Sequence, residues 1–380
     1  MNTELNHIAG QLQQAQRPEE VFGHIGGAPA EQAAKLKKIF LQLAKTTHPD
    51  AYPGCEDQAA AQAAFNRLTD WYESAQTRIQ DGVYGSTNPL DDWRVVLRTR
   101  KRAYVLENAF TEGPLYTSYP GSFEEDGRRC AVLLKITRDP CDNDLAENET
   151  NSLQALKAGK AVKKFGNYLP RLLDSFLYED GGVFRQVNVF ERAPGWVSLV
   201  EVRQRYPRGL DAREVAWIWR RVLVALGFAH LNGRIHGALL PCNIEILPEL
   251  HGLRLVEWSY SVARAEPPGD AAGECLTALD PAYADWCPGD VQCGNPPLPG
   301  MDISMAARCM IELLGGDPLR RTLPASVPQP LCAFFKGSTL PGKRSQPQDA
   351  WSLKGEFEDL IRPLWGEQKF QPFVMQPIHE

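Results

Sequence analysis

The segment from residue 234 to residue 259, RIHGALLPCNIEILPELHGLRLVEWS, constrains the fold of this chain more than any other. It contains two short apolar runs, at 244–247 and 253–257, after a loop that includes Pro241. Short apolar runs separated by turn-forming residues are typical of β-strands. We therefore expect an approaching strand, a polar loop and then a β-hairpin.

The loop in this segment resembles the catalytic loop of protein kinases. The family reads HRDLKPxN there, whereas this chain reads HGALLPCN at 236–243, and Glu257-Trp258-Ser259 stands in place of the DFG turn. Kinase chemistry needs a carboxylate in the loop to orient the substrate hydroxyl and accept its proton. Ala238 replaces that carboxylate. The resemblance therefore implies a pseudokinase, and we expect the protein not to be an enzyme.

Lys135 and Glu149, which precede the loop in the sequence, resemble the ion pair that holds nucleotide phosphates in the same family. Lys135 ends the apolar run AVLLK, which is similar to the VAIK strand, and Glu149 falls in the following predicted helix. The phosphate-covering loop is poorly matched, because Asn108 and Phe110 stand where the first two glycines belong. Phe110 is expected to fill that space. ATP binding is therefore left open.

The metal-binding positions of the family correspond to Asn243 and Glu257. Glutamate keeps the charge of the usual aspartate, but its longer side chain changes the geometry, and Mg²⁺ requires a near-ideal octahedral arrangement. We expect no Mg²⁺ site. The four residues of the vestigial nucleotide pocket are Lys135, Glu149, Asn243 and Glu257.

The N-terminal region predicts two amphipathic helices, over about 31–45 and 57–80, because apolar residues recur in both at helical spacing. His48-Pro49-Asp50 ends the first, since proline disfavours a helical conformation at the preceding residue. Two helices joined in this way are expected to pack as an antiparallel hairpin. An HPD tripeptide between a basic helix and a second helix resembles the J-domain of the DnaJ family.

This second resemblance implies a partner, because J-domains dock on a DnaK-class ATPase chaperone and stimulate its ATP hydrolysis. Basic residues of the first helix would steer the domain to an acidic surface. The alternative is that the tripeptide only turns the chain. The residues implied in chaperone binding are His48, Pro49, Asp50, Lys35, Lys38 and Lys45.

The fold class that these segments predict is α+β. An all-α, J-domain-like helical hairpin precedes a bilobal, protein-kinase-like fold with a β-rich small lobe and an α-rich large lobe. The predicted parts are 1–86 for the hairpin, 87–102 for a linker and lead-in strand, 103–192 for the small lobe and 193–380 for the large lobe with its tail.

Several elements within the lobes are also predicted. Residues 104–136 indicate a β-meander, with turns at Tyr119-Pro120-Gly121 and at Asp126-Gly127. Apolar spacing predicts helices over 212–231 and about 353–364. The tail after the last helix carries Phe370 and Phe373, and it is expected either to pack on the large lobe or to cover a groove.

Composition excludes several classes of protein. A formal net charge of -6 argues against a general nucleic-acid binder. No segment reaches the length of a membrane span or has the pattern of a signal peptide. Nine cysteines without a CxxC pair favour free thiols in the cytoplasm. Cys275, Cys287 and Cys293 are too widely spaced for a zinc site.

The sequence as a whole favours a co-chaperone adaptor. In this hypothesis the J-domain-like part stimulates a DnaK-class chaperone, while the pseudokinase part binds a protein client or partner. Two alternatives are an atypical active kinase and a pure scaffold whose J-domain-like part no longer engages a chaperone. The sequence does not indicate which client is bound.

Overall fold

The computed structural model divides the chain into two compact units, Met1–Arg94 and Val95–Glu380. The predicted boundary at residue 86 precedes this division, and residues 87–94 of the predicted linker lie outside the described residues. The structure describes residues 3–15, 17–52, 56–80, 82, 84–85, 95–107, 110–264, 273–342, 345–367 and 370–375.

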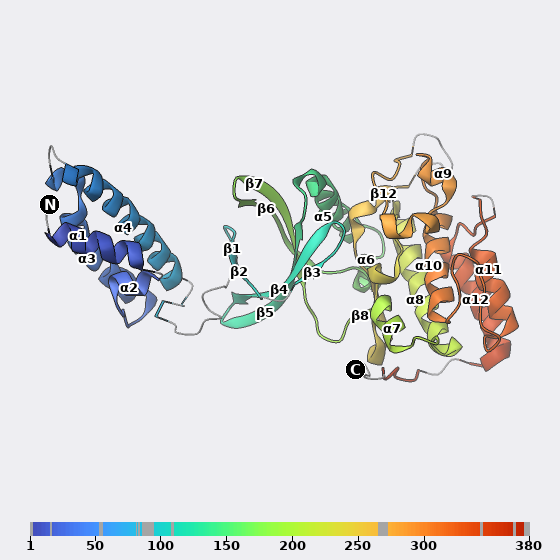
Figure 1. Cartoon of the computed structure of the whole chain (residues 1–380). Helices are drawn as coiled ribbons and strands as arrows, with labels where there is room; N and C mark the ends of the chain where they lie inside the picture. The colour runs from blue at the N-terminus through green and yellow to red at the C-terminus, as the bar shows by residue number, and fades with distance from the viewer. Residues whose placement is uncertain are drawn as a thin grey trace. The chain divides into compact units, whose positions relative to one another are not determined.

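The first unit is helical (Figure 1). Proline begins both α2 and α3, at positions where its missing N–H has no helical acceptor in any case. The elements are α1 (Thr3–Gln14), α2 (Pro18–Phe22), α3 (Pro29–Thr47), the 3-10 helix η1 (Pro49–Ala51) and α4 (Glu56–Gln80).

Helices α3 and α4 pack side by side around Leu36 and Leu68, as the predicted hairpin requires. Helix α1 was not predicted, although Leu5, Ile8 and Leu12 repeat at helical spacing in the sequence. These side chains join the same core, and Trp71 Nε1 donates a hydrogen bond to the Leu12 carbonyl oxygen at 3.1 Å. The first unit is therefore a bundle of helices rather than a hairpin alone.

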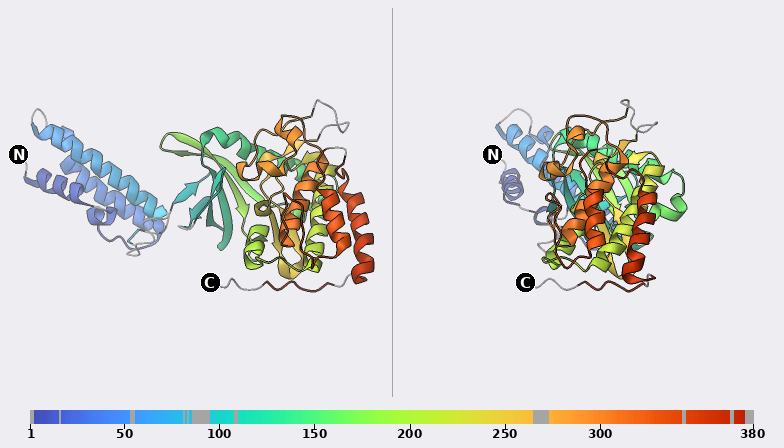
Figure 2. Two further views of the ribbon diagram at one scale, coloured as in Figure 1. Left: turned by 45° about the vertical axis from the view of Figure 1, so that its right-hand side comes forward. Right: turned by 90° about the vertical axis from the view of Figure 1, so that its right-hand side faces the viewer.

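The first part of the second unit is an antiparallel sheet with the order β1-β2-β4-β5-β7-β6, and β3 pairs with β4. Helix α5 packs against β6 and β7 (Figures 1 and 2). The elements are β1 (Val96–Arg98), β2 (Ala103–Leu106), β3 (Thr111–Glu112), β4 (Tyr116–Glu125), β5 (Arg128–Thr137), η2 (Pro140–Asp142), α5 (Asn143–Lys157), α6 (Val162–Phe165), η3 (Gly166–Tyr168), β6 (Leu172–Asp180) and β7 (Val183–Glu191).

The turn predicted at Tyr119-Pro120-Gly121 is wrong, because β4 runs straight through these residues and pairs with β5 along its whole length. Gly121 serves packing here. A Cβ at this position would lie 2.7 Å from the Val105 carbonyl oxygen of the neighbouring strand. The glycine therefore marks a close approach of two strands, which sequence alone does not distinguish from a turn.

Alternation along β5 sorts its side chains between the two faces of the sheet. Val132 and Leu134 belong to the core of the face that also contains Tyr104 and Val187. Lys135 consequently points to the other face, where α5 lies.

The second part of this unit is mainly helical. A three-stranded sheet of order β11-β10-β8 and a β9–β12 pair accompany the helices. The elements are β8 (Val197–Ser198), α7 (Leu199–Arg205), α8 (Ala212–Leu231), β9 (Arg234–Ile235), η4 (Pro241–Asn243), β10 (Ile244–Leu247), η5 (Pro248–Leu250), β11 (Gly252–Leu255), η6 (Trp258–Tyr260), β12 (Val262–Ala263), η7 (Pro281–Trp286), α9 (Gly289–Gln292), α10 (Pro299–Leu313), α11 (Gln329–Ser338) and α12 (Ala350–Trp365).

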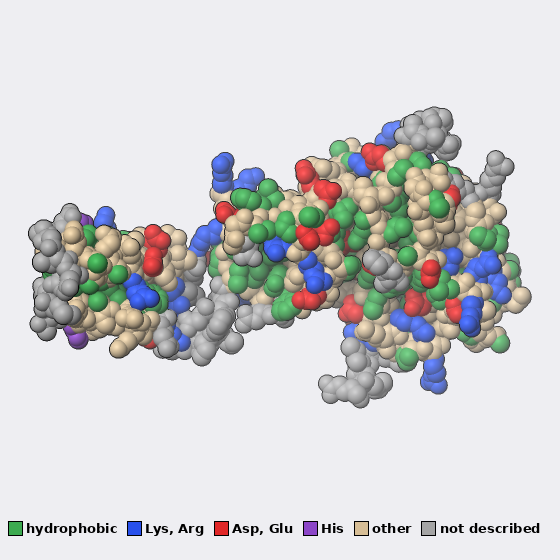
Figure 3. All heavy atoms as spheres, turned by 45° about the horizontal axis from the view of Figure 1, so that its top comes forward, with side chains coloured by type: hydrophobic (Ala, Val, Ile, Leu, Met, Phe, Trp, Pro, Cys, Tyr) green, Lys and Arg blue, Asp and Glu red, His purple; other side chains and the backbone are tan. Residues whose placement is uncertain are grey.

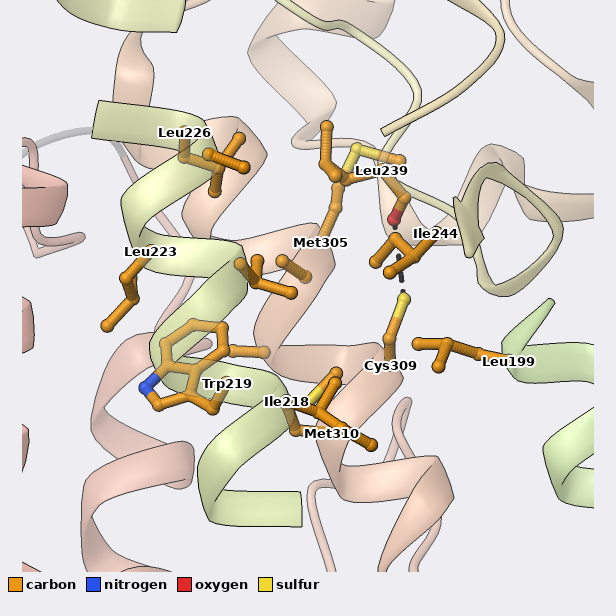
Figure 4. Packing of buried hydrophobic residues seen from close by; sticks show 14 of the residues in the cluster. Leu199, Ile218, Trp219, Leu223, Leu226, Leu239, Ile244, Met305, Cys309 and Met310 are labelled. Carbon is orange, nitrogen blue, oxygen red and sulfur yellow. Dashed lines mark hydrogen bonds between the residues drawn. The ribbon is translucent and has the colours of Figure 1, made fainter. Parts of the chain in front are cut away.

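The core of this part forms where α8 meets α10 (Figure 4). Ile218 of α8 lies beside Met310 of α10, and both side chains are buried. The Cys309 thiol donates to the carbonyl oxygen of Leu239 at 3.5 Å, which ties α10 to the loop before β10. The predicted hairpin is present as β10 and β11, paired from Ile244 and Leu255 onward.

The tail after α12 packs on the same core. Phe373 is buried and its ring centroid lies 5.9 Å from that of Tyr206, while Phe370 is exposed and contacts His251. Of the two placements expected for the tail, the structure therefore has packing on the large lobe.

Charged side chains of both signs are interspersed on the face shown in Figure 3. No helix in the described part of the chain is long and apolar enough to cross a membrane.

Truncation of the α3–α4 core is expected to open the first unit. Leu68→Ala should lower the free energy of opening of α4 by about 2–5 kcal/mol, since Leu68 is fully buried. Hydrogen exchange of α4 amides in the whole protein measures this. Leu41→Ala is the control, because Leu41 is 51% exposed and should change the same quantity by less than about 0.5 kcal/mol. Equal effects of the two substitutions would contradict the packing described.

Candidate functional site

The loop at 236–243 is held from below by Asp302 of α10. Its carboxylate is fully buried and accepts backbone N–H bonds from His236 at 2.8 Å and from Gly237 at 3.0 Å. His230 Nε2 lies 3.0 Å from the same carboxylate. One buried acid therefore fixes the start of the loop and joins it to both central helices.

His236 is a structural residue of this loop. Its Nε2 must carry the proton, because it lies 3.0 Å from the carbonyl oxygen of Val256, which can only accept. Its Nδ1 then accepts the N–H of Ala238 at 3.4 Å. Burial lowers the pKa of His236, so the neutral ring is the form that fits this pattern.

The centre of the loop contains no acid. Ala238 is buried, and its carbonyl oxygen accepts a hydrogen bond from Asn243 Nδ2 at 2.9 Å. Asn243 thus braces the loop across its own turn. Leu240 is also buried in the large core, so its side chain does not face a substrate.

Lys135 lies between two carboxylates. Its Nζ is 2.8 Å and 2.9 Å from the two oxygens of Glu149 on α5, and 2.8 Å from Glu257 Oε2 before η6. The Glu149 carboxylate also accepts from Asn188 Nδ2 at 3.1 Å and from the Trp258 N–H at 3.3 Å. We call Lys135, Glu149 and Glu257 the Lys135 cluster.

Burial and charge act in opposite directions on this cluster. Burial alone would lower the pKa of Lys135, but the carboxylates of Glu149 and Glu257 outweigh it, and the pKa is raised. Burial raises the pKa of Glu149, and the second carboxylate adds to this rise while Lys135 opposes it. The lysine is therefore held as a cation whose charge is already balanced within the chain.

Tyr116 and Ser259 complete this arrangement, and neither was predicted. Ser259 Oγ donates to Glu257 at 2.6 Å, so the Tyr116 hydroxyl donates to Ser259 Oγ at 2.8 Å. Lys135 Nζ lies 4.2 Å from the centre of the Tyr116 ring, which adds a cation–π contact. No spacing in the sequence relates Tyr116 to Ser259, because 143 positions separate them.

Little open space remains beside the cluster. The cavity bordered by Tyr116, Asn243 and Glu257 has a volume of about 90 Å³. Typical ligand pockets enclose roughly 300–1,000 Å³. Phe110 was expected to fill this space, but it is 54% exposed and lies against Tyr119. Tyr116 and Tyr260 are the aromatic residues that border the cavity. Asn108 lies outside the described residues.

The residues singled out in the first unit lie on α3 and the turn after it. Lys35, Lys38 and Lys45 are exposed on α3. The His48 ring lies 5.1 Å from that of Phe65 on α4, and Pro49 begins η1. The side chain of Asp50 lies outside the described residues.

A metal site needs several ligating side chains close together. Within the described residues, no group of three or more histidine, cysteine or acidic side chains could hold a metal ion. This also applies to Cys275, Cys287 and Cys293, whose thiols are free.

Comparison with solved structures gives the class of the fold. The chain superposes on vaccinia related kinase 3 with a TM-score of 0.53 and 16% sequence identity, covering 71% of this chain and 90% of that chain. No family model matches the sequence, and no curated protein matches it. The chain has a protein-kinase-like fold. Three features of the unit Val95–Glu380 agree with the predicted kinase-like fold. They are the antiparallel sheet, the Lys135–Glu149 pair and the loop held by Asp302.

Gly237 is expected to be indispensable for the loop. It has φ +82°, and a Cβ there would collide with the carbonyl oxygen of Tyr260. Gly237→Ala should lower the free energy of unfolding by about 2–4 kcal/mol, from backbone strain and overpacking together. Urea denaturation followed by tryptophan fluorescence measures this loss.

Gly233 offers a matched control for that substitution. It has φ +70°, but a Cβ there would meet nothing within 4 Å. Gly233→Ala should therefore show the strain alone, about 1 kcal/mol. If both substitutions cost the same, the close approach at Gly237 contributes nothing.

Proposed function

We propose that the protein is a co-chaperone adaptor without phosphotransferase activity. In this proposal the first unit acts as a J-domain that stimulates ATP hydrolysis by a DnaK-class chaperone. The kinase-like unit acts as a pseudokinase that binds a protein client or partner. The chaperone would then act on whatever the second unit holds.

The pseudokinase part of the proposal is supported by one observation. The side chains that phosphoryl transfer would need are bonded to other residues of the chain. Lys135 is bound by Glu149 and Glu257, and Asn243 braces the loop. At Ala238 there is no carboxylate to accept a proton. This pattern favours a retained frame over an active site.

The co-chaperone part is supported by the arrangement of the first unit. His48 and Pro49 lie at the end of α3, where the chain turns toward α4. The exposed amines of Lys35, Lys38 and Lys45 are available to an acidic partner surface. Helix α1 has no counterpart in the predicted pattern, but its core side chains face α3 and α4 and leave the lysines exposed.

Two alternatives differ from this proposal in class. An atypical active kinase would have to use Glu257 and Asn243 with a base from another place in the chain. A pure scaffold would keep the kinase-like unit as a binding platform, while the first unit would not engage a chaperone. The two experiments below separate the three functions.

The whole protein is expected to speed ATP turnover by a DnaK-class chaperone. His48→Gln should abolish this stimulation, because the imidazole at the helix end is part of the proposed contact. Steady-state phosphate release measures it. His7→Gln is the matched control, since His7 is exposed on α1 and its loss should leave stimulation unchanged. Absence of stimulation by the unaltered protein would favour the scaffold.

The purified protein is expected to transfer no phosphate from ATP to itself or to a generic substrate in the presence of Mg²⁺. Its melting temperature should also be unchanged by ATP, because Lys135 is already paired and the cavity is small. Radiolabel transfer and a thermal shift measure the two quantities.

The protein would be an atypical kinase instead if it transferred phosphate from ATP, if Lys135→Ala abolished this transfer, and if Lys336→Ala did not. Lys336 is an exposed lysine of α11, so its substitution tests whether any lost activity is specific to the cluster.

A further inference from the structure

A second cavity lies in the large lobe, away from the Lys135 cluster. Its volume is about 580 Å³, within the range of roughly 300–1,000 Å³ for small-molecule sites. It is bordered by the end of η7, by α9 and α10, and by the loop between α11 and α12. Figure 1 shows this loop and α9 at the same end of α10. None of the three residues of the Lys135 cluster borders it.

The wall of this cavity is largely apolar. Trp286, Pro288, Leu340 and Pro341 border it. An apolar wall favours a ligand with an apolar body.

Among the described residues that border the cavity, Arg308 is the one cation. Arg308 projects from α10 one helical turn after Ser304, and both side chains border the cavity. The Arg308 guanidinium donates from Nη1 to the Pro318 carbonyl oxygen at 2.7 Å. Its Nε is shielded from solvent and has no hydrogen-bond partner among the described residues.

Lys135 is paired with two carboxylates, whereas the hydrogen-bond partner of Arg308 is a neutral carbonyl oxygen. Burial lowers the pKa of Arg308, and the neighbouring cation Arg321 lowers it further. Desolvation of a guanidinium without an acid is unfavourable, and a bound oxyanion offsets this cost with charge-assisted hydrogen bonds. Asp290 also borders the cavity, but it has an interaction partner of its own.

We propose that this cavity binds a small organic phosphate. The phosphate group is held by Arg308, and the apolar body lies against Trp286 and Leu340. The guanidinium of Arg308 favours a doubly charged phosphate over a singly charged carboxylate, because the Coulomb attraction grows with the ligand charge. Binding here is independent of the co-chaperone function and of the cleft beside Lys135.

Isothermal titration of the whole protein with three compounds tests this proposal. Phenyl phosphate offers both the anion and the apolar body, inorganic phosphate offers only the anion, and phenol offers only the apolar body. Phenyl phosphate is expected to bind at least about tenfold more tightly than either of the others, since one charge-assisted hydrogen bond corresponds to about that factor.

Substitution of the cation localises the binding. Arg308→Gln should weaken phenyl phosphate binding by about tenfold or more. Arg308→Lys, which keeps the charge but loses the planar fork, should weaken it by a smaller factor. Arg320→Gln is the matched control. Arg320 is an exposed arginine in the loop after α10, and it does not border the cavity.

Several outcomes would overturn the proposal. These are no measurable binding of phenyl phosphate, binding of phenol as tight as that of phenyl phosphate, or an unchanged dissociation constant in both Arg308 variants. A purely structural role of Arg308 predicts that Arg308→Gln lowers the melting temperature equally with and without phenyl phosphate. The proposal instead predicts that the wild-type protein and the Arg320→Gln control gain more melting temperature from the ligand than Arg308→Gln does.

Discussion

The buried cation of Lys135 connects three parts of the kinase-like unit. It joins strand β5 to helix α5 through Glu149 and to the turn before η6 through Glu257. A buried charge is tolerated only when its partners and their remaining hydrogen bonds are satisfied. Here Asn188, Ser259 and the Trp258 N–H supply those bonds. The cluster is therefore a structural joint made from groups that serve a nucleotide in active kinases.

The loop at 236–243 follows the same principle. Asp302 fixes its beginning through two backbone N–H groups, and Asn243 closes its turn. None of these bonds depends on a side chain at position 238. The shape of the loop is thus independent of the side chain at position 238.

Sequence predicted the parts of the fold that depend on local periodicity. The helix at 212–231 and the strand at 244–247 have the predicted bounds. Features that depend on distant packing were not predicted. Gly121 resembles a turn residue until the neighbouring strand is in place. The contact of Tyr116 with Ser259 requires the two lobes to be assembled, so no local pattern indicates it.

Glu257 has a left-handed backbone, with φ 66° and ψ 65°. A side chain other than glycine costs about 1–2 kcal/mol in this conformation, and the ion pair with Lys135 offsets that cost. Loss of Lys135 would leave Glu257 strained and would deprive both Glu149 and Glu257 of their cation, while loss of Glu257 would leave the lysine with one counterion. Each residue of the cluster thus limits which substitutions the others can accept. Sequence drift in this protein is expected to change the three positions jointly or to leave them all unchanged.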